Sequence, residues 1–101
     1  MEIIFTNHAL ERMSRVSKVS IEFIKNEIKK HIYNSVKYEG SNVCKVAGDN
    51  FSYLFSINNG KIIVITILFK RKDKKDKRKK YTLGKVGINN LIKQTKHFRL
   101  G

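Results

Sequence analysis

The stretch Phe51–Phe69, FSYLFSINNGKIIVITILF, holds the strongest structural signal in this sequence. In its first half, aromatic and apolar residues alternate with Ser52, Leu54 and Ser56, as expected for a strand whose two faces differ. Asn59-Gly60 follows, and Asn-Gly between two strand-like runs is the strongest short signal for a two-residue hairpin loop. The second half is almost entirely apolar, which is typical of a central strand covered on both faces. The stretch therefore predicts an antiparallel hairpin inside a sheet.

A two-residue loop also fixes which residues of the hairpin face each other. Counting outward from the loop pairs Ile57 with Ile62, Phe55 with Val64, Tyr53 with Thr66, and Phe51 with Leu68. Thr66 would then lie opposite Tyr53 as a polar position on an otherwise apolar face.

Two helices are expected before the hairpin. The first covers about residues 8–15, with Thr6 or Asn7 as its N-cap. The second covers about residues 20–33 and begins at Ser20. In this second helix four isoleucines form one apolar stripe, and four charged residues are expected to face water. The stripe is Ile21, Ile24, Ile28 and Ile32, and the charged residues are Lys25, Glu27, Lys29 and Lys30.

Short strands and one more helix complete the predicted secondary structure. Strands are expected at residues 36–38, 43–47 and 81–83, with residues 2–5 as an edge strand or an extended lead-in, and a short C-terminal helix over about residues 88–96. The predicted fold is one α+β domain over residues 1–101. Two N-terminal helices pack on a four- to five-stranded antiparallel sheet, with a short C-terminal helix.

The charge balance is the most unusual feature of the composition. The 101 residues include 22 Lys and Arg against 8 Asp and Glu, a formal net charge of +14. Such a charge attracts polyanions, and nucleic acid is the default partner. An acidic protein partner is compatible with it, whereas anionic membrane would require a long basic amphipathic helix that the sequence lacks.

The cysteine count and the apolar runs exclude further classes of protein. Cys44 is the only cysteine, so no internal disulfide and no Cys-based zinc site is expected, and no other metal or cofactor is predicted. The longest apolar run, Ile62–Phe69, is too short to cross a membrane. The N-terminus lacks the pattern of a signal peptide, so we expect a cytoplasmic protein. A domain of a larger secreted toxin would share these features.

His8 and Arg12 are the first candidates for chemistry. Residues four apart on a helix project to the same side, so the first helix would present both together. A ribonuclease without metal needs a group that moves the proton of the 2′-hydroxyl and a cation that stabilises charge on the phosphate oxygens. Histidine titrates near neutral pH, and the arginine fork fits a phosphate. An exposed basic helix face would give the same spacing.

A run of cations is the second candidate feature. Residues 70–80 hold nine Lys or Arg and two Asp, and such a segment would bind phosphates without reading sequence. Its candidate nucleic-acid-binding residues, together with Arg15 near the first helix, are Lys70, Arg71, Lys72, Lys74, Lys75, Lys77, Arg78, Lys79 and Lys80. Tyr53 and His97 are auxiliary candidates: Tyr53 as a ring on which a base stacks, although core packing also explains it, and His97 as a second acid–base group.

The pattern His8-Ala9-Leu10-Glu11-Arg12-Met13, with Ser20-Ile21 opening a helix and Val64-Ile65-Thr66-Ile67 in a late strand, resembles a family of small bacterial domains. These are the RelE/ParE-like toxins of the barnase–EndoU–colicin–RelE group of ribonucleases, and the resemblance covers about the first 70 residues. It implies metal-independent cleavage of tRNA or mRNA that leaves a 2′,3′-cyclic phosphate, with His8, Arg12 and Thr66 as site residues. The family's second arginine corresponds to Arg15 at a different spacing.

Three functions follow from these features. The first is a ribonuclease toxin, with RNA as substrate and an acidic antitoxin or immunity protein as its neutralising partner. The second is a non-catalytic RNA- or DNA-binding module that uses the same basic surface. The third is an accessory protein whose charge serves solubility or docking.

Overall fold

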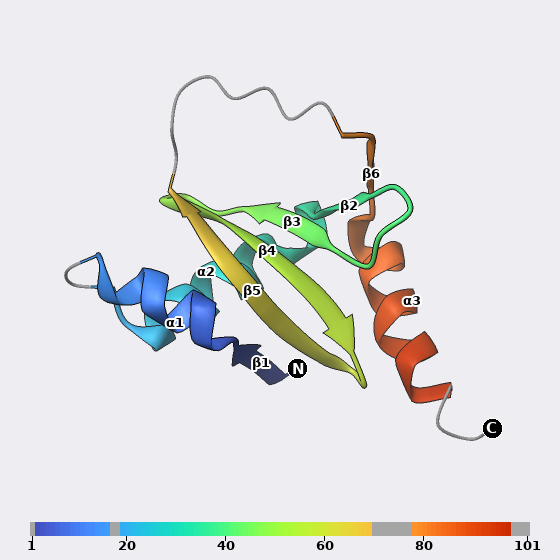
Figure 1. The fold of residues 1–101 in the computed structure, drawn as a ribbon. Coiled ribbons are helices and arrows are strands. Elements are labelled where there is room, and N and C mark those ends of the chain that lie inside the picture. Colours follow the sequence, from blue (N-terminus) through green and yellow to red (C-terminus); the bar gives the residue numbers. More distant parts are fainter. Residues whose placement is uncertain (1, 17–18, 70–77, 98–101) are drawn as a thin grey trace.

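The computed structural model describes residues 2–16, 19–69 and 78–97, with residues 94–97 described by their backbone alone. Its elements are, in order, β1 (Glu2–Phe5), α1 (Asn7–Ser14), α2 (Ile21–His31), a short 3-10 helix η1 (Ile32–Asn34), β2 (Val36–Tyr38), β3 (Cys44–Ala47), β4 (Phe51–Asn58), β5 (Lys61–Phe69), β6 (Lys80–Thr82) and α3 (Gly84–His97). The strands form one sheet in the order β1-β5-β4-β3-β2-β6. In Figure 1, α1 is seen to the left of the strands, α3 to their right, and α2 behind them.

The α+β class is confirmed, but the predicted antiparallel sheet of four to five strands is wrong. The sheet has six strands and is mixed, because β1 pairs in parallel with β5. A parallel pair needs a long connection between its strands, and here two helices and three strands separate β1 from β5. No local sequence pattern predicts a pairing between strands so far apart in the chain. The C-terminal helix also starts earlier than predicted, at Gly84.

Ser20 is confirmed as the cap of α2, and Thr6, one of the two candidates for α1, is its N-cap. The Thr6 hydroxyl accepts a hydrogen bond from the Ala9 amide (3.1 Å), and the Ser20 hydroxyl accepts one from the Phe23 amide (3.0 Å). Each satisfies an amide that the first helical turn leaves without a partner. The predicted stripe of α2 is right for Ile24, Ile28 and Ile32, which are buried, but wrong for Ile21, which is 43% exposed.

The central hairpin has the predicted two-residue loop. Asn59 and Gly60 both have positive φ angles, 53° and 75°, as a tight primed turn requires. Near the loop, Ile57 faces Ile62 and Phe55 faces Val64 as predicted. Beyond Val64 the register shifts by one residue, because Ile65 forms a bulge.

The bulge changes what lies opposite the second half of β4. Tyr53 faces Ile67 and Phe51 faces Phe69, so the predicted pairs of Tyr53 with Thr66 and of Phe51 with Leu68 are wrong. Thr66 faces Leu54, on the opposite face of the sheet from the buried Tyr53.

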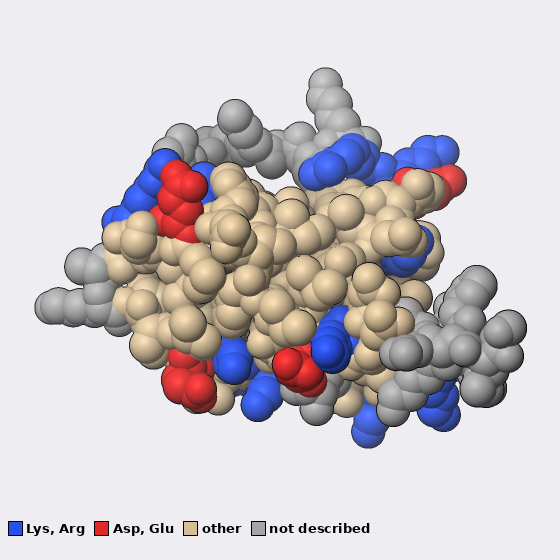
Figure 2. Space-filling model, turned by 60° about the horizontal axis from the view of Figure 1, so that its bottom comes forward, with Lys and Arg blue, Asp and Glu red and all other residues tan. Residues whose placement is uncertain are grey.

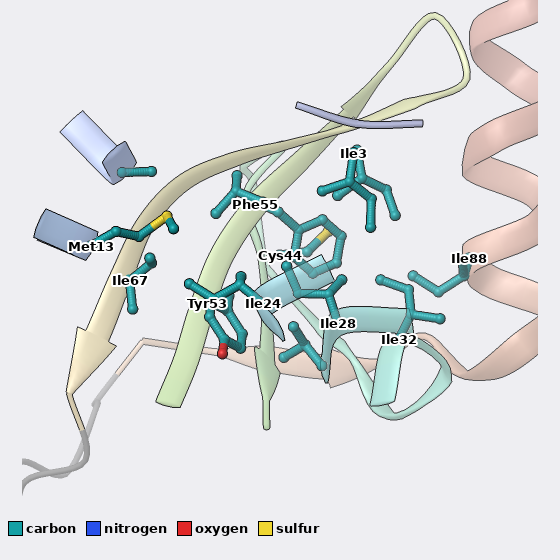
Figure 3. Close-up of a cluster of buried hydrophobic side chains, with 14 residues drawn as sticks. Ile3, Met13, Ile24, Ile28, Ile32, Cys44, Tyr53, Phe55, Ile67 and Ile88 are labelled. Atoms are coloured by element: carbon teal, nitrogen blue, oxygen red, sulfur yellow. The ribbon is translucent and has the colours of Figure 1, made fainter. Parts of the chain in front are cut away.

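The core lies between the helices and one face of the sheet. Met13 of α1 packs near Ile67, while Ile28 and Ile32 lie close to Ile88 of α3 (Figure 3). All three helices therefore pack on one hydrophobic cluster, which fixes α1 against β5. No helix in the described ranges is long and apolar enough to cross a membrane.

Candidate active site

Helix α1 lies along the part of β5 that β1 leaves uncovered. β1 pairs with β5 only from Lys61 to Val64. Just beyond, the Thr6 amide donates to the Val64 carbonyl (3.1 Å) and the Thr6 hydroxyl donates to the carbonyl of the bulged Ile65 (2.9 Å). The start of α1 thus continues the hydrogen bonding of the strand edge, which would otherwise present unpaired carbonyls.

Arg12 makes a further contact with this edge, six residues after Thr6. Its Nε donates to the Ile67 carbonyl at 2.7 Å, and its guanidinium carbon lies 4.9 Å from the centre of the Phe69 ring. Phe69 in turn packs edge-on against Phe51, with ring centres 5.7 Å apart. One hydrogen bond and one ring therefore hold the guanidinium at the end of β5.

The two terminal nitrogens of Arg12 make no hydrogen bond or ion pair with the residues that the structure describes. Because only Nε donates to the Ile67 carbonyl, the two terminal nitrogens can donate hydrogen bonds to a phosphate or a carboxylate. The arginine thus combines a fixed position with an unused pair of donors.

His8 lies one turn before Arg12 on the same side of α1 and is exposed. No hydrogen bond or ion pair joins its ring to another described residue, so its nitrogens are accessible to a ligand. The predicted proximity of His8 and Arg12 on one helix side therefore matches their arrangement on α1.

Thr66 is the neighbour of Ile67, whose carbonyl receives Arg12, but its side chain projects to the other face of the sheet. The Phe69 ring beneath Arg12 lies on the helix face, as do Tyr53 and Ile67. The structure thus brings Arg12 to the backbone beside Thr66, and it separates the two side chains by the plane of the sheet.

Tyr53, an auxiliary candidate, is fully buried, and its hydroxyl donates to Glu27 Oε1 at 2.6 Å. Burial, together with the neighbouring Glu27 carboxylate, raises the pKa of Tyr53 far above its ordinary value. A base has no access to this ring in the folded protein.

Glu27, like Ile21, differs from the prediction: the sequence pattern places it facing water, but it is 6% exposed. Besides Tyr53 it accepts a hydrogen bond from the Asn50 side chain (3.0 Å) and from the amides of Asn50 and Phe51 (both 3.4 Å). Burial acts to raise the pKa of Glu27, but these four donors outweigh it and lower that pKa below 4.5. The only sequence signal was its position between Ile24 and Ile28, close to the apolar stripe.

The predicted cationic residues are described only in part. Arg15 is exposed and pairs with Glu11 at 3.2 Å, one turn earlier on the same helix. Arg78, Lys79 and Lys80 are exposed near β6. Figure 2 shows a broad surface whose centre carries neither basic nor acidic side chains, with Lys and Arg and several Asp and Glu around its margin. The remaining candidates lie outside the described residues, as does the side chain of His97: Lys70, Arg71, Lys72, Lys74, Lys75 and Lys77.

Two other kinds of reactive site, a metal centre and a cysteine nucleophile, are not found among the described residues. It contains no group of three or more His, Cys, Asp or Glu that could hold a metal ion. Cys44 is buried, and burial raises the pKa of its thiol to about 11, so it is protonated at neutral pH.

Comparison with known proteins gives no relative: no family model, curated protein or solved structure matches the chain.

Proposed function

We propose that this protein binds RNA and cleaves it without a metal ion, as a ribonuclease toxin similar to the RelE/ParE-like domains. The observation that carries the proposal is the arrangement on α1. Arg12 is held by the Ile67 carbonyl and the Phe69 ring with its terminal nitrogens unused, and the exposed His8 lies one turn away. A net charge of +14 supplies the attraction for RNA.

The reaction would be attack of the 2′-oxygen on the adjacent phosphorus. The bond between O2′ and phosphorus forms, the bond between phosphorus and O5′ breaks, and a 2′,3′-cyclic phosphate remains. One proton must leave the 2′-oxygen and another must reach the 5′-oxygen, and His8 performs one of these transfers. Arg12 stabilises the negative charge on the non-bridging oxygens with its terminal nitrogens.

The other candidate residues have supporting roles in this proposal. Thr66 lies on the opposite face of the sheet and acts as an auxiliary group only if RNA passes around the edge of β5. Arg15 and the cations of residues 70–80 hold phosphates of a tRNA or mRNA. A toxin of this kind acts in the bacterial cytoplasm, and an acidic antitoxin or immunity protein would neutralise its cationic surface.

The experiment incubates the purified protein with tRNA and with total RNA in EDTA. We expect cleavage by the unmodified protein, loss of cleavage with binding retained in His8→Ala, and unchanged cleavage in His31→Ala. His31 is a matched control because it lies on another helix, where its ring contacts Asp49. Intact RNA after incubation with the unmodified protein would reject the enzyme.

A second function, RNA or DNA binding without cleavage, is favoured by one observation. No described residue orients the His8 ring, whereas catalytic histidines are usually fixed by a hydrogen bond to their second nitrogen. Tight, salt-sensitive binding that leaves RNA intact, and that His8→Ala does not change, would establish this function instead.

A further inference from the structure

The edge of the sheet farthest from His8 and Arg12 carries a second concentration of cations and aromatic rings. The far edge consists of β6 and its neighbour β2, and four strand spacings separate β6 from β5. At about 4.8 Å per spacing this is about 19 Å. In Figure 1, α1 and β6 lie near opposite edges of the sheet, at the left and the right of the view.

Cation–ring pairs are concentrated at this edge. Of the five such contacts among the described residues, three involve rings of β2 or β6, a fourth joins η1 to α3 beside these strands, and the fifth is Arg12 on Phe69. The four pairs are Lys37 on Tyr81 (5.6 Å), Arg78 on Tyr38 (4.0 Å), Lys80 on Tyr38 (5.8 Å) and Lys85 on Tyr33 (5.7 Å).

The strand register places the pairs that involve Lys80 and Tyr81 on different faces of the sheet. Tyr38 faces Lys80 on one face of the sheet, and Lys37 faces Tyr81 on the other. The Leu83 amide donates to the Ser35 carbonyl (3.0 Å), which brings the chain near Lys85 beside the chain near Tyr33. One continuous edge thus carries all four pairs.

Two of the rings are substantially exposed. Tyr81 is 49% and Tyr33 is 40% exposed, whereas Tyr38 is covered. Beside Tyr38, a pocket of about 440 Å³ opens between Arg78, Lys79 and the turn that holds Glu39 and Ser41. The pocket contains one acidic side chain, Glu39, against two cations.

We propose that this edge is a docking surface for single-stranded RNA, with unpaired bases stacked on Tyr81 and Tyr33 and phosphates held by the adjacent cations. Exposed rings next to cations are the two components of single-strand binding, because every base has a stacking face and every nucleotide has a phosphate. This proposal rests on the proposed RNA function, and it adds that affinity is set at the edge far from His8. An RNA strand of about six stacked nucleotides spans the distance between the two sites.

The test measures Kd by fluorescence anisotropy with a labelled single-stranded RNA of 12 nucleotides. It uses the His8→Ala protein, so the RNA stays intact whether or not the unmodified protein cleaves. We expect Tyr81→Ala to weaken binding by about fivefold to a hundredfold, and Tyr81→Phe to bind like the parent. Phe23→Ala is the matched control, because Phe23 is 41% exposed on α2, away from this edge.

The charged residues are tested by the salt dependence of Kd. Replacing Lys37 and Lys85 by Gln removes two phosphate contacts and should reduce the slope of log K against log salt by about 1.4. The control replaces Lys25 and Lys29 on α2, which removes the same charge and should leave the slope nearly unchanged.

The docking surface would be overturned if Tyr81→Ala and Phe23→Ala changed Kd equally, or if the two double lysine replacements changed the salt slope equally. The cations at β6 would then serve only to prevent an edge strand from pairing with another chain. Equal affinity for a double-stranded RNA of the same sequence would also overturn it, because paired bases cannot stack on the rings. Absence of cleavage by the unmodified protein would reject the ribonuclease and leave these Kd comparisons valid.

Discussion

Replacing Arg12 by Met tests whether this arginine is part of the fold as well as a candidate for phosphate binding. The change removes the hydrogen bond to the Ile67 carbonyl, worth about 1.5 to 3 kcal/mol for a charged donor. It also removes the contact with Phe69, worth about 0.5 to 1 kcal/mol. Methionine keeps most of the apolar stem, so packing changes little. We therefore expect the free energy of unfolding to fall by about 2 to 4 kcal/mol.

Urea unfolding followed by circular dichroism measures this loss. Arg15→Met is the matched control, because Arg15 pairs with Glu11 on the exposed side of the same helix, where such a pair contributes about 0.3 to 0.5 kcal/mol. Equal losses for the two variants would refute a structural role of Arg12 at the end of β5. If the loss is large, the activity of Arg12→Met must be measured without urea and at a temperature at which the variant is folded.

Three further outcomes concern the buried carboxylate. Glu27→Ala should lower the free energy of unfolding by about 1 to 3 kcal/mol, because the buried Tyr53 hydroxyl loses its acceptor, whereas the exposed Asn26→Ala should change it by less than about 0.5 kcal/mol in urea unfolding. Gly48→Ala should cost about 1 to 3 kcal/mol in the same measurement, because its new Cβ would overlap the Glu27 carboxylate; an unchanged midpoint would contradict this packing. The pKa of Glu27 is lowered in the folded protein, so its stabilisation is complete above the unfolded pKa of about 4.5 and is lost as pH falls through the folded value. Urea midpoints between pH 7 and pH 2 should show this loss, and Glu27→Gln should reduce the pH dependence; equal pH dependence in both proteins would contradict it.

Local signals in the sequence predicted much of the fold. Thr6 and Ser20 begin their helices because a side-chain oxygen can accept from the first turn, and Asn59-Gly60 forms a tight loop because both residues tolerate positive φ. These features depend on residues close together in the chain. The α+β class followed from their order.

The features that the sequence did not predict depend on distant contacts. The bulge at Ile65 is bonded from Thr6, 59 residues away, and it moves Thr66 to the face opposite Tyr53. Glu27 is buried because Gly48 leaves room for its carboxylate and Tyr53 donates to it. Neither arrangement produces a periodicity that a sequence pattern could reveal.

Only the part of the candidate site that depends on helix geometry could be predicted from the sequence. The spacing of His8 and Arg12 placed them on one side of α1, but the contacts of Arg12 with Ile67 and Phe69 required the position of α1 on β5. The rings and cations of β2 and β6 come from segments that no motif connects. Sheet order alone brings them together.

The most direct test of the ribonuclease proposal identifies the 3′ ends of tRNA fragments produced by the purified protein in EDTA. The proposal predicts 2′,3′-cyclic phosphate ends, because the 2′-oxygen is the attacking group, and it predicts that His8→Ala yields no fragments. Intact tRNA, fragments with 3′-hydroxyl ends, or unchanged cleavage by His8→Ala would contradict it.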